Sequence, residues 1–333
     1  MKKALLIGGT GVISLSVTRR LLQSSEWDVT VLNRGTHPEL LPKGAKLLCC
    51  DIADEAAAVQ ALSGQYYDCV AQFINFTPEQ AQRDVRLFSG KTAQYIFISS
   101  ASAYRKPMPS PWITESTALC NPYWQYSRDK IACERILFDA FVQSGFPVTV
   151  VRPSHTYDCR KIPVQLHGKI GSWQVAERIR QGKPVVVAGD GTSLWTLTHS
   201  RDFAKGFVGL MANPAAIGEA VHITSDESIP WNEIYRSLGR ALGREPIFCH
   251  VASDAIIRRD PAQEGPLLGD KSNSVLFDNH KLKRLVPGFC AETRIESGLR
   301  ESVEYALAHA ELMQPDPAFD AWCDQVIREE MSD

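Results

Sequence analysis

The sequence has 333 residues, of which 44% are hydrophobic and 22% are charged, as in an ordinary folded globular protein large enough for two lobes. Thirty-six basic and 38 acidic residues leave a formal net charge of −2, so no global positive field favours a nucleic-acid partner. Because no apolar run approaches the roughly 18 residues of a membrane span and no C-x-x-C pair occurs, we expect a cytoplasmic protein without a metal site or membrane contact.

The first predicted element is a short buried strand over residues 4–7, which leads through a glycine turn into a helix over 12–24. Glycines that open a helix let a pyrophosphate approach the backbone N–H groups and the positive end of the helix dipole. In the G-x-x-G-x-x-G spacing the third position is Ser14, which is small enough for the helix to pack on the strand. We therefore predict dinucleotide binding at this turn, with contacts from Gly8, Thr10, Gly11, Val12 and Ile13.

Short apolar runs then alternate with helical segments, which predicts an α/β fold with a doubly wound parallel sheet of the Rossmann type. Further strands are expected at 28–32, 46–49, 68–74, 94–98, 147–151, 185–187 and 220–223. Helices are expected at 54–62, 78–88, 123–144, 171–181, 201–211, 231–242, 295–310 and 317–330.

The alternation breaks after Arg152-Pro153, where a second lobe is expected to begin. We predict a dinucleotide-binding domain over 1–155 to which the chain returns at about 184–224, including Val185–Val187 as a strand of the same sheet. The second lobe then comprises 156–183 and 225–333. The apolar residues Ile234, Tyr235, Leu238 and Leu242 recur at helical spacing and are expected to face its core.

The end of the second strand is where such folds contact the adenosine ribose, and here it carries Asn33 and Arg34. An acidic residue there would favour NAD, whereas Arg34 can pair with the additional phosphate of NADP. The sequence therefore favours NADP over NAD. The alternative is that Arg34 is solvated or stacks on adenine, which leaves NAD acceptable.

Three further cofactor contacts are predicted after the third and fourth strands. Asp51 and Ile52 come after the third strand and are expected beside the adenine. Asn75 follows the fourth strand and is expected near the nicotinamide ribose.

We expect the catalytic residues where the strand over 94–98 ends in a serine-rich segment that includes Ser100. On a helix downstream, Tyr126 and Lys130 are four residues apart and therefore share one face. A nearby ammonium lowers the pKa of a phenol, so Tyr126 can exchange a proton with an alcohol or ketone while Ser100 holds the oxygen. Lys130 is also expected to hold the nicotinamide ribose.

These motifs resemble the extended branch of the short-chain dehydrogenase/reductase superfamily, which contains nucleotide-sugar epimerases and dehydratases. The likeness rests on GGTGVIS, SSASAY and YSRDK, and extends to Val151-Arg152-Pro153, Gly189-Asp190-Gly191 and Glu296-Ser297-Gly298. It implies a Rossmann domain with a smaller C-terminal substrate-binding lobe, and a homodimer. It also implies that Ser100, Tyr126 and Lys130 are catalytic, that Gly8, Gly11 and Asp51 contact the cofactor, and that Ser102 and Tyr104 contact the substrate.

Two more substrate positions follow from this resemblance. His155 stands where many members have an asparagine near the sugar, although a packed or solvent-facing histidine fits equally. Trp195 stands near the usual position of an arginine that clamps the substrate diphosphate, and an indole can stack on a base or sugar but cannot replace a guanidinium. Ala101 and Ser102 occupy the places of the usual dehydratase acid-base pair, which disfavours dehydration.

The sequence thus predicts an NAD(P)-dependent epimerase or reductase that acts at a carbinol or ketone carbon of a sugar or nucleotide-sugar. The alternative is a catalytically silent nucleotide-sensing or RNA-binding protein on the same scaffold, since the Asn33-Arg34 pair with Ser14 is similar to an atypical subgroup that includes chloroplast RNA-associated proteins.

Overall fold

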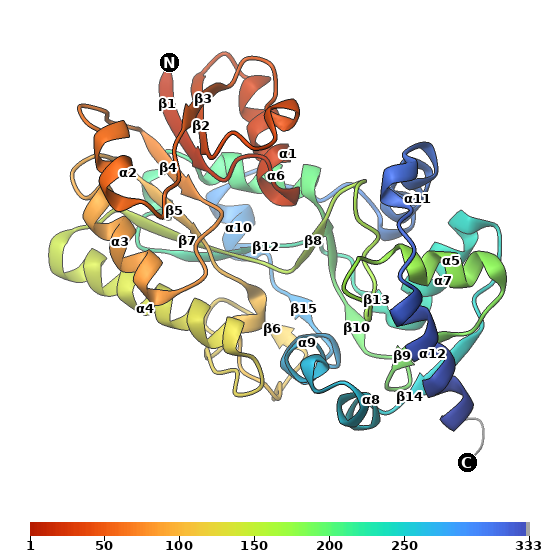
Figure 1. The fold of residues 1–333 in the computed structure, drawn as a ribbon. Helices are drawn as coiled ribbons and strands as arrows, with labels where there is room; N and C mark the ends of the chain where they lie inside the picture. Colours follow the sequence, from red (N-terminus) through yellow and green to blue (C-terminus); the bar gives the residue numbers. More distant parts are fainter. Residues whose placement is uncertain (331–333) are drawn as a thin grey trace.

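A seven-stranded parallel sheet forms the frame of the protein, whose computed structural model describes residues 1–330. The strand order is β12-β7-β5-β4-β1-β2-β3, so the chain winds outward in two directions from β1 and β4 (Figure 1). The strands are β1 (Lys2–Ile7), β2 (Trp27–Asn33), β3 (Lys46–Cys49), β4 (Cys69–Gln72), β5 (Tyr95–Ile98), β7 (Val148–Pro153) and β12 (Ala220–Ile223). The predicted Rossmann fold is therefore confirmed.

Helices cover both faces of this sheet and produce two separate cores. On one face lie α1 (Val12–Leu22), α6 (Ser200–Leu210) and α10 (His280–Leu285); on the other lie α2 (Glu55–Ala61), α3 (Pro78–Phe88) and α4 (Gln125–Ser144). Side chains of β1 alternate between them, because Ala4 and Leu6 pack on the α1 side whereas Leu5 and Ile7 pack on the α2 side. A strand buried on both faces explains the unbroken apolar run in the sequence.

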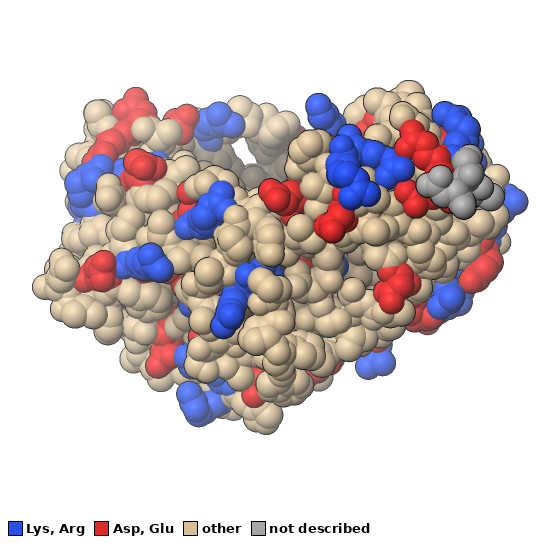
Figure 2. Space-filling model, turned by 90° about the horizontal axis from the view of Figure 1, so that it is seen from below, with Lys and Arg blue, Asp and Glu red and all other residues tan. Residues whose placement is uncertain are grey.

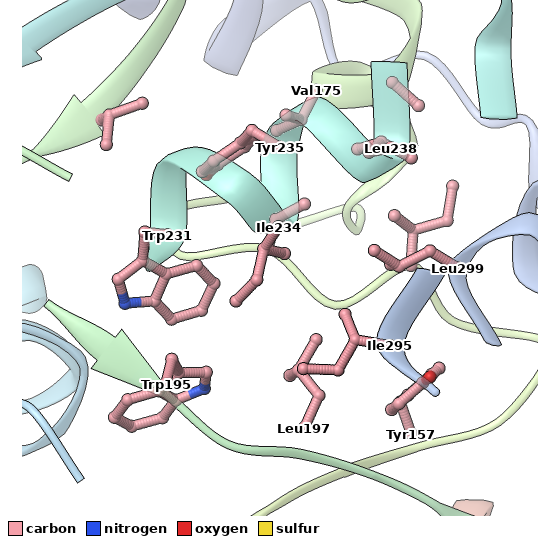
Figure 3. Packing of buried hydrophobic residues seen from close by; sticks show 14 of the residues in the cluster. Tyr157, Val175, Trp195, Leu197, Trp231, Ile234, Tyr235, Leu238, Ile295 and Leu299 are labelled. Carbon is pink, nitrogen blue, oxygen red and sulfur yellow. The ribbon is translucent and has the colours of Figure 1, made fainter. Parts of the chain in front are cut away.

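The second lobe is built around α7 (Trp231–Leu242), whose apolar face packs against strands and helices from distant parts of the chain (Figure 3). Ile234, Tyr235 and Leu238 are buried and Leu242 is partly buried, as their spacing predicted. The other helices are α5 (Trp173–Gln181), α8 (Ser253–Arg259), α9 (Glu264–Pro266), α11 (Ile295–Ala308) and α12 (Pro317–Glu330).

Four pairs of short strands lie outside the large sheet. They are β6 (Trp112–Ile113) with β15 (Leu276–Phe277), β8 (His155–Tyr157) with β11 (Leu197–His199), β10 (Leu194–Trp195) with β13 (Ile229–Pro230), and β9 (Val185–Ala188) with β14 (Phe248–Val251).

One sequence prediction about the sheet is wrong. β9 was expected to rejoin the large sheet, but it pairs with β14 and its side chains pack in the second lobe. A four-residue apolar run satisfies any buried parallel pairing, so its composition could not distinguish the two sheets. The chain returns to the large sheet through α6 and β12. The two-lobe boundaries around this return stay a prediction.

No helix among residues 1–330 is both long and apolar enough to cross a membrane. On the face that Figure 2 shows, acidic and basic side chains are interspersed, and neither sign forms a broad patch.

The glycine turn between β1 and α1 is closed by two hydroxyls. Ser14 Oγ accepts from the Gly11 N–H at 2.8 Å and donates to the Gly8 carbonyl at 2.6 Å, while Thr18 Oγ1 donates to the Gly9 carbonyl at 2.8 Å. Gly8 has φ of +80°, and a Cβ there would lie 2.4 Å from Ile74 Cγ2. The turn therefore requires glycine at this position for both conformation and space.

We predict that Gly8→Ala lowers the free energy of unfolding by about 2–3 kcal/mol, because left-handed strain and the contact with Ile74 add. The matched control is Gly64→Ala, since Gly64 has φ of +67° but a Cβ added there would meet no neighbour within 4 Å. The expected loss in the free energy of unfolding for Gly64→Ala is about 1 kcal/mol, from backbone strain alone. Urea denaturation measures both, and equal losses would contradict the steric part of the argument.

Candidate functional site

The predicted catalytic side chains meet at the C-terminal edge of the sheet. Ser100 follows β5, while Tyr126 and Lys130 lie on the first two turns of α4. All three line one cavity of about 410 Å³ between the large sheet and the second lobe, together with the predicted substrate residues Ser102, His155 and Trp195. We call this space the reaction cavity, after the role predicted for it. The structure therefore brings together residues that are far apart in the sequence.

Lys130 is held inside the protein by one carbonyl that ends β5 and another in the segment after β4. Its Nζ donates to the main-chain carbonyls of Asn75 and of Ile98, the latter at 2.8 Å, and the side chain is almost fully buried. Burial lowers the pKa of Lys130 to about 8. The ammonium lies 4.7 Å from the centre of the Phe76 ring, which adds a cation–π contact.

The pKa of Tyr126 is raised, whereas the sequence analysis predicted that it would be lowered. Burial raises the pKa of the phenol and the carboxylate of Asp270 raises it further, whereas a hydrogen bond with the Ser100 hydroxyl lowers it. Lys130 is 5.8 Å from the centre of the Tyr126 ring, but its ammonium donates to carbonyls instead. The phenol is therefore protonated at neutral pH, and the predicted lowering by Lys130 is not observed.

Ser102 orients Ser100 through a chain of hydroxyls. The oxygens of the two serines are 2.8 Å apart, and Ser127 donates to Ser102 at 2.8 Å. Asn121 Nδ2 donates to the Ser102 carbonyl at 2.8 Å, which fixes the turn after β5. Ser102 is thus a positioning residue for Ser100 as well as part of the cavity wall.

Two of the predicted substrate residues, His155 and Trp195, contact each other. Trp195 Nε1 donates to His155 Nδ1 at 3.2 Å, so the ring proton of a neutral His155 is on Nε2. Burial and the positive charges of Lys271 and Lys161 lower the pKa of His155 well below its usual value. Trp195 is 2% exposed and stacks on Trp231 with ring centres 5.4 Å apart, so that face is closed to a substrate base or sugar (Figure 3).

Tyr104 does not belong to the cavity, contrary to the sequence prediction. It is fully buried, and its hydroxyl contacts His222 Nδ1 at 3.1 Å and accepts from Arg152 at 3.3 Å. Arg152 in turn forms a buried ion pair with Glu134 of α4 at 2.6 Å. The short helical turn Ala101–Ala103 reverses the chain after Ser100 and directs Tyr104 into the core behind the site.

The predicted cofactor residues gather in a neighbouring cavity of about 520 Å³ beside the glycine turn. The members that line it are Gly8, Thr10, Gly11, Asn33, Arg34, Asp51 and Ile52. Ile13 lines the reaction cavity, while Val12 lines a third cavity of about 550 Å³. Gly11 lines both the cavity beside the glycine turn and the third cavity, and Lys161 lines both the third cavity and the reaction cavity. The third cavity therefore lies between the other two.

Asn75 has a different role from the one predicted. Its side chain donates to Asp84 at 2.7 Å and accepts from Arg83 at 2.9 Å, so it is committed to a buried network rather than to a ribose. Its main-chain carbonyl instead accepts from Lys130. Asn75 therefore positions Lys130 through its main chain.

The sequence analysis missed four charged residues of the reaction cavity, namely Lys106, Lys161, Asp270 and Lys271. They come from three segments that are far apart in the chain, and no regular spacing connects them. It also missed Gln80 and Arg83, which line the cavity beside the glycine turn. Only the tertiary fold identifies these residues.

Comparison with known proteins agrees with this architecture. The sequence model of the NAD dependent epimerase/dehydratase family matches residues 4–224. The chain is 28% identical over 291 residues to 2'-dehydrokanamycin reductase of Streptomyces kanamyceticus, covering 86% of this chain and 80% of that protein. It is 26% identical over 263 residues to the chloroplast stem-loop binding protein of 41 kDa b of Arabidopsis thaliana, covering 75% of this chain and 66% of that protein.

Two solved structures share the fold at lower identity. UDP-glucuronic acid 4-epimerase from Bacillus cereus, in complex with UDP-glucuronic acid and NAD, has a TM-score of 0.74 at 18% identity and covers 92% of this chain and 99% of that one. The epimerase Mth375 from Methanothermobacter thermautotrophicus has a TM-score of 0.75 at 16% identity and covers 94% of both chains.

Proposed function

The chain belongs to the NAD-dependent epimerase/dehydratase family, and from this membership we propose that it reduces a ketone of a sugar-like, nucleotide-linked substrate. The observation that carries the proposal is that Ser100, Tyr126 and Lys130 line one cavity, which the third cavity separates from the cavity beside the glycine turn. Reduction is favoured over oxidation because a phenol with a raised pKa is a proton donor at neutral pH.

The cavity beside the glycine turn fits a dinucleotide. Gly8 and Gly11 line this cavity without side chains, and the N-terminus of α1 directs its partial positive charge toward the cavity. When bound, the nicotinamide supplies the hydride for reduction. This step needs a protein group that neutralises the developing alkoxide.

We propose that Tyr126 donates its proton to the substrate oxygen, while the hydroxyl of Ser100 holds that oxygen in place. Ser102 keeps Ser100 oriented through their 2.8 Å contact. The positive charge of Lys130 supports the phenolate that remains after proton transfer, and its two carbonyl contacts hold α4 against the sheet. All four of these side chains line the same cavity.

We propose NADP as the cofactor rather than NAD. Asn33 Oδ1 accepts from the Gly35 N–H at 2.8 Å, so the end of β2 offers no carboxylate that would repel a phosphate. Arg34 is exposed at the rim of the cavity and has no hydrogen-bond or ion-pair partner among residues 1–330. Its guanidinium can therefore form a bidentate pair with a ribose phosphate.

The second candidate function is a catalytically silent nucleotide-binding protein. The observation in its favour is the similarity of this chain to a protein named as a stem-loop binding protein. Against it, the interspersed charges of Figure 2 offer no broad basic face for a nucleic acid on the side shown. Such a protein would keep its behaviour when the phenol of Tyr126 is removed.

We predict that Tyr126→Phe lowers kcat for ketone reduction by about 10²- to 10⁴-fold, because the proton donor is lost. NADPH affinity should be unchanged. Stopped-flow absorbance of the nicotinamide measures turnover, and fluorescence titration measures binding. Tyr123→Phe is the matched control, since Tyr123 precedes the same helix but does not line the cavity. Equal activity of both variants and the native protein would favour the silent binder.

Activity should also depend on pH through Lys130. Burial lowers its pKa to about 8, so the ammonium is present below this pH and is lost above it. We predict that kcat/KM for reduction falls as pH rises through about 8, and that Lys130→Arg moves this decline to higher pH because arginine stays charged. A native profile that is flat through this range would contradict a role for the ammonium.

Cofactor choice is tested by Arg34→Ala. We expect NADPH binding to weaken by about tenfold or more and NADH binding to be unchanged, because only NADPH carries the phosphate that the guanidinium would hold. Titration of the same protein samples with both cofactors provides the internal control. Equal losses for the two cofactors, or no loss for either, would refute the proposed NADP contact.

A further inference from the structure

A buried lysine that has no part in the proposed reduction lines the reaction cavity. Lys106 is 3% exposed and borders the same space as Ser100 and Tyr126. Lysines are almost never this buried unless a protein partner or a ligand compensates their charge. Lys106 therefore requires either a partner or a function.

The protein offers the amine of Lys106 no direct partner. Within residues 1–330 its Nζ forms no hydrogen bond and no ion pair, and the carboxylate of Asp270 acts on it only as a more distant charge. Burial lowers the pKa of Lys106, and the charge of Asp270 opposes this change without reversing it. At neutral pH, more of Lys106 is therefore the uncharged amine than is the case for a lysine in water.

The other lysines of the cavity differ from Lys106 in burial or in bonding. Lys130 is also buried, but its Nζ donates to two main-chain carbonyls, which stabilise the charged form. Lys161 is exposed and Lys271 is only half-buried. A buried amine whose lone pair is free is therefore expected at Lys106.

Main-chain hydrogen bonds fix the position of Lys106. Its own N–H donates to the Cys120 carbonyl at 2.7 Å, and the N–H of Arg105 donates to the Ala118 carbonyl at 2.7 Å. These bonds pair the segment that follows Tyr104 with the segment that leads into α4. The lysine is thus carried on paired main chain rather than on a free loop.

Asn121 connects this paired segment to two sides of the cavity. Its Nδ2 donates to the Ser102 carbonyl at 2.8 Å and to the Gly269 carbonyl at 2.7 Å. The residue after Gly269 is Asp270, whose carboxylate borders the cavity. One amide therefore ties both the serine turn after β5 and the acidic residue to the segment that carries the lysine.

A neutral amine in such a cavity is a nucleophile toward a carbonyl carbon. The lone pair of Nζ forms a C–N bond while the π electrons of the C=O bond move to the oxygen, which takes one proton from the amine and becomes a hydroxyl. Loss of this hydroxyl with the second amine proton, as water, leaves an imine. The phenol of Tyr126 and the carboxylate of Asp270 border the same cavity and can carry these protons. The reaction consumes no oxidant and no reductant.

We propose that Lys106 is a nucleophilic lysine that forms an imine with a small aldehyde or ketone in the reaction cavity. The inference goes beyond the proposed reductase function, because imine formation needs neither NADPH nor hydride transfer. A structural role as counter-charge to Asp270 does not account for the arrangement, since the two side chains form no ion pair that would compensate their burial. The imine gives the site a covalent way to hold a carbonyl ligand.

The test traps the imine on the native protein in the absence of a nicotinamide cofactor. The full chain is incubated near neutral pH with dihydroxyacetone and sodium cyanoborohydride, which reduces an imine to a stable secondary amine. Peptide mass spectrometry then locates the adduct and follows its rate of formation. We expect Lys106 to be modified about tenfold or more faster than the exposed Lys43, because a lower pKa leaves more of the lysine as neutral amine.

Variants assign the adduct to the named residue. Lys106→Arg and Lys106→Met should both abolish the fast modification, and the arginine variant keeps the positive charge while removing the amine that forms the imine. Lys43→Arg is the matched control, which should remove only a slow adduct and leave the fast one unchanged. Thermal melting of each variant monitors folding, and the labelling of the native chain needs no variant at all.

Two outcomes would overturn the inference. The first is that Lys106 is trapped no faster than Lys43, and the second is that the adduct forms preferentially on another lysine of the cavity. Neither outcome affects the proposed reductase activity, which is judged by NADPH binding and by Tyr126→Phe. Conversely, failure of NADPH to bind would refute the proposed function, whereas trapping on the cofactor-free protein would still report on Lys106.

Discussion

The buried ammonium of Lys130 connects the parts on which this site depends. By donating to the carbonyl of Asn75, in the segment after β4, and to that of Ile98, at the end of β5, it attaches the first turns of α4 to the C-terminal edge of the sheet. Tyr126 is one turn earlier on the same helix, so its place in the cavity follows from this attachment. The ion pair of Glu134 with Arg152 of β7 repeats the connection one turn further along. Removal of either charge would leave its partner buried and uncompensated.

The same burial determines the chemistry. A side chain that is shielded from water loses solvation of its charged form, which makes an amine less basic and a phenol less acidic. Burial accordingly lowers the pKa of Lys130 and raises that of Tyr126. The result is a protonated phenol next to a hydroxyl, an arrangement suited to delivering a proton. The second lobe contributes to it, because Asp270 lies on a segment that packs against the start of α4.

Local sequence patterns were sufficient for most of the Rossmann sheet and for the meeting of Ser100, Tyr126 and Lys130. Such motifs act through short-range geometry: a strand ends, a glycine turn follows, and residues four apart share a helix face. The same reasoning failed for Tyr104 and Asn75, whose side chains turn into buried networks with Arg152 and Arg83. It failed for β9 as well, since an apolar run contains no information about its partner strand.

What the sequence by itself determined is therefore the Rossmann fold and the positions of Ser100, Tyr126 and Lys130 along it. Only the tertiary structure decided the acidity of Tyr126, the closed face of Trp195 and the convergence of Lys106, Lys161 and Lys271. The physical reason is the distance along the chain over which the deciding interactions act. Backbone conformation and amphipathic spacing depend on near neighbours in the chain, whereas burial and electrostatic environment depend on which distant segments pack together.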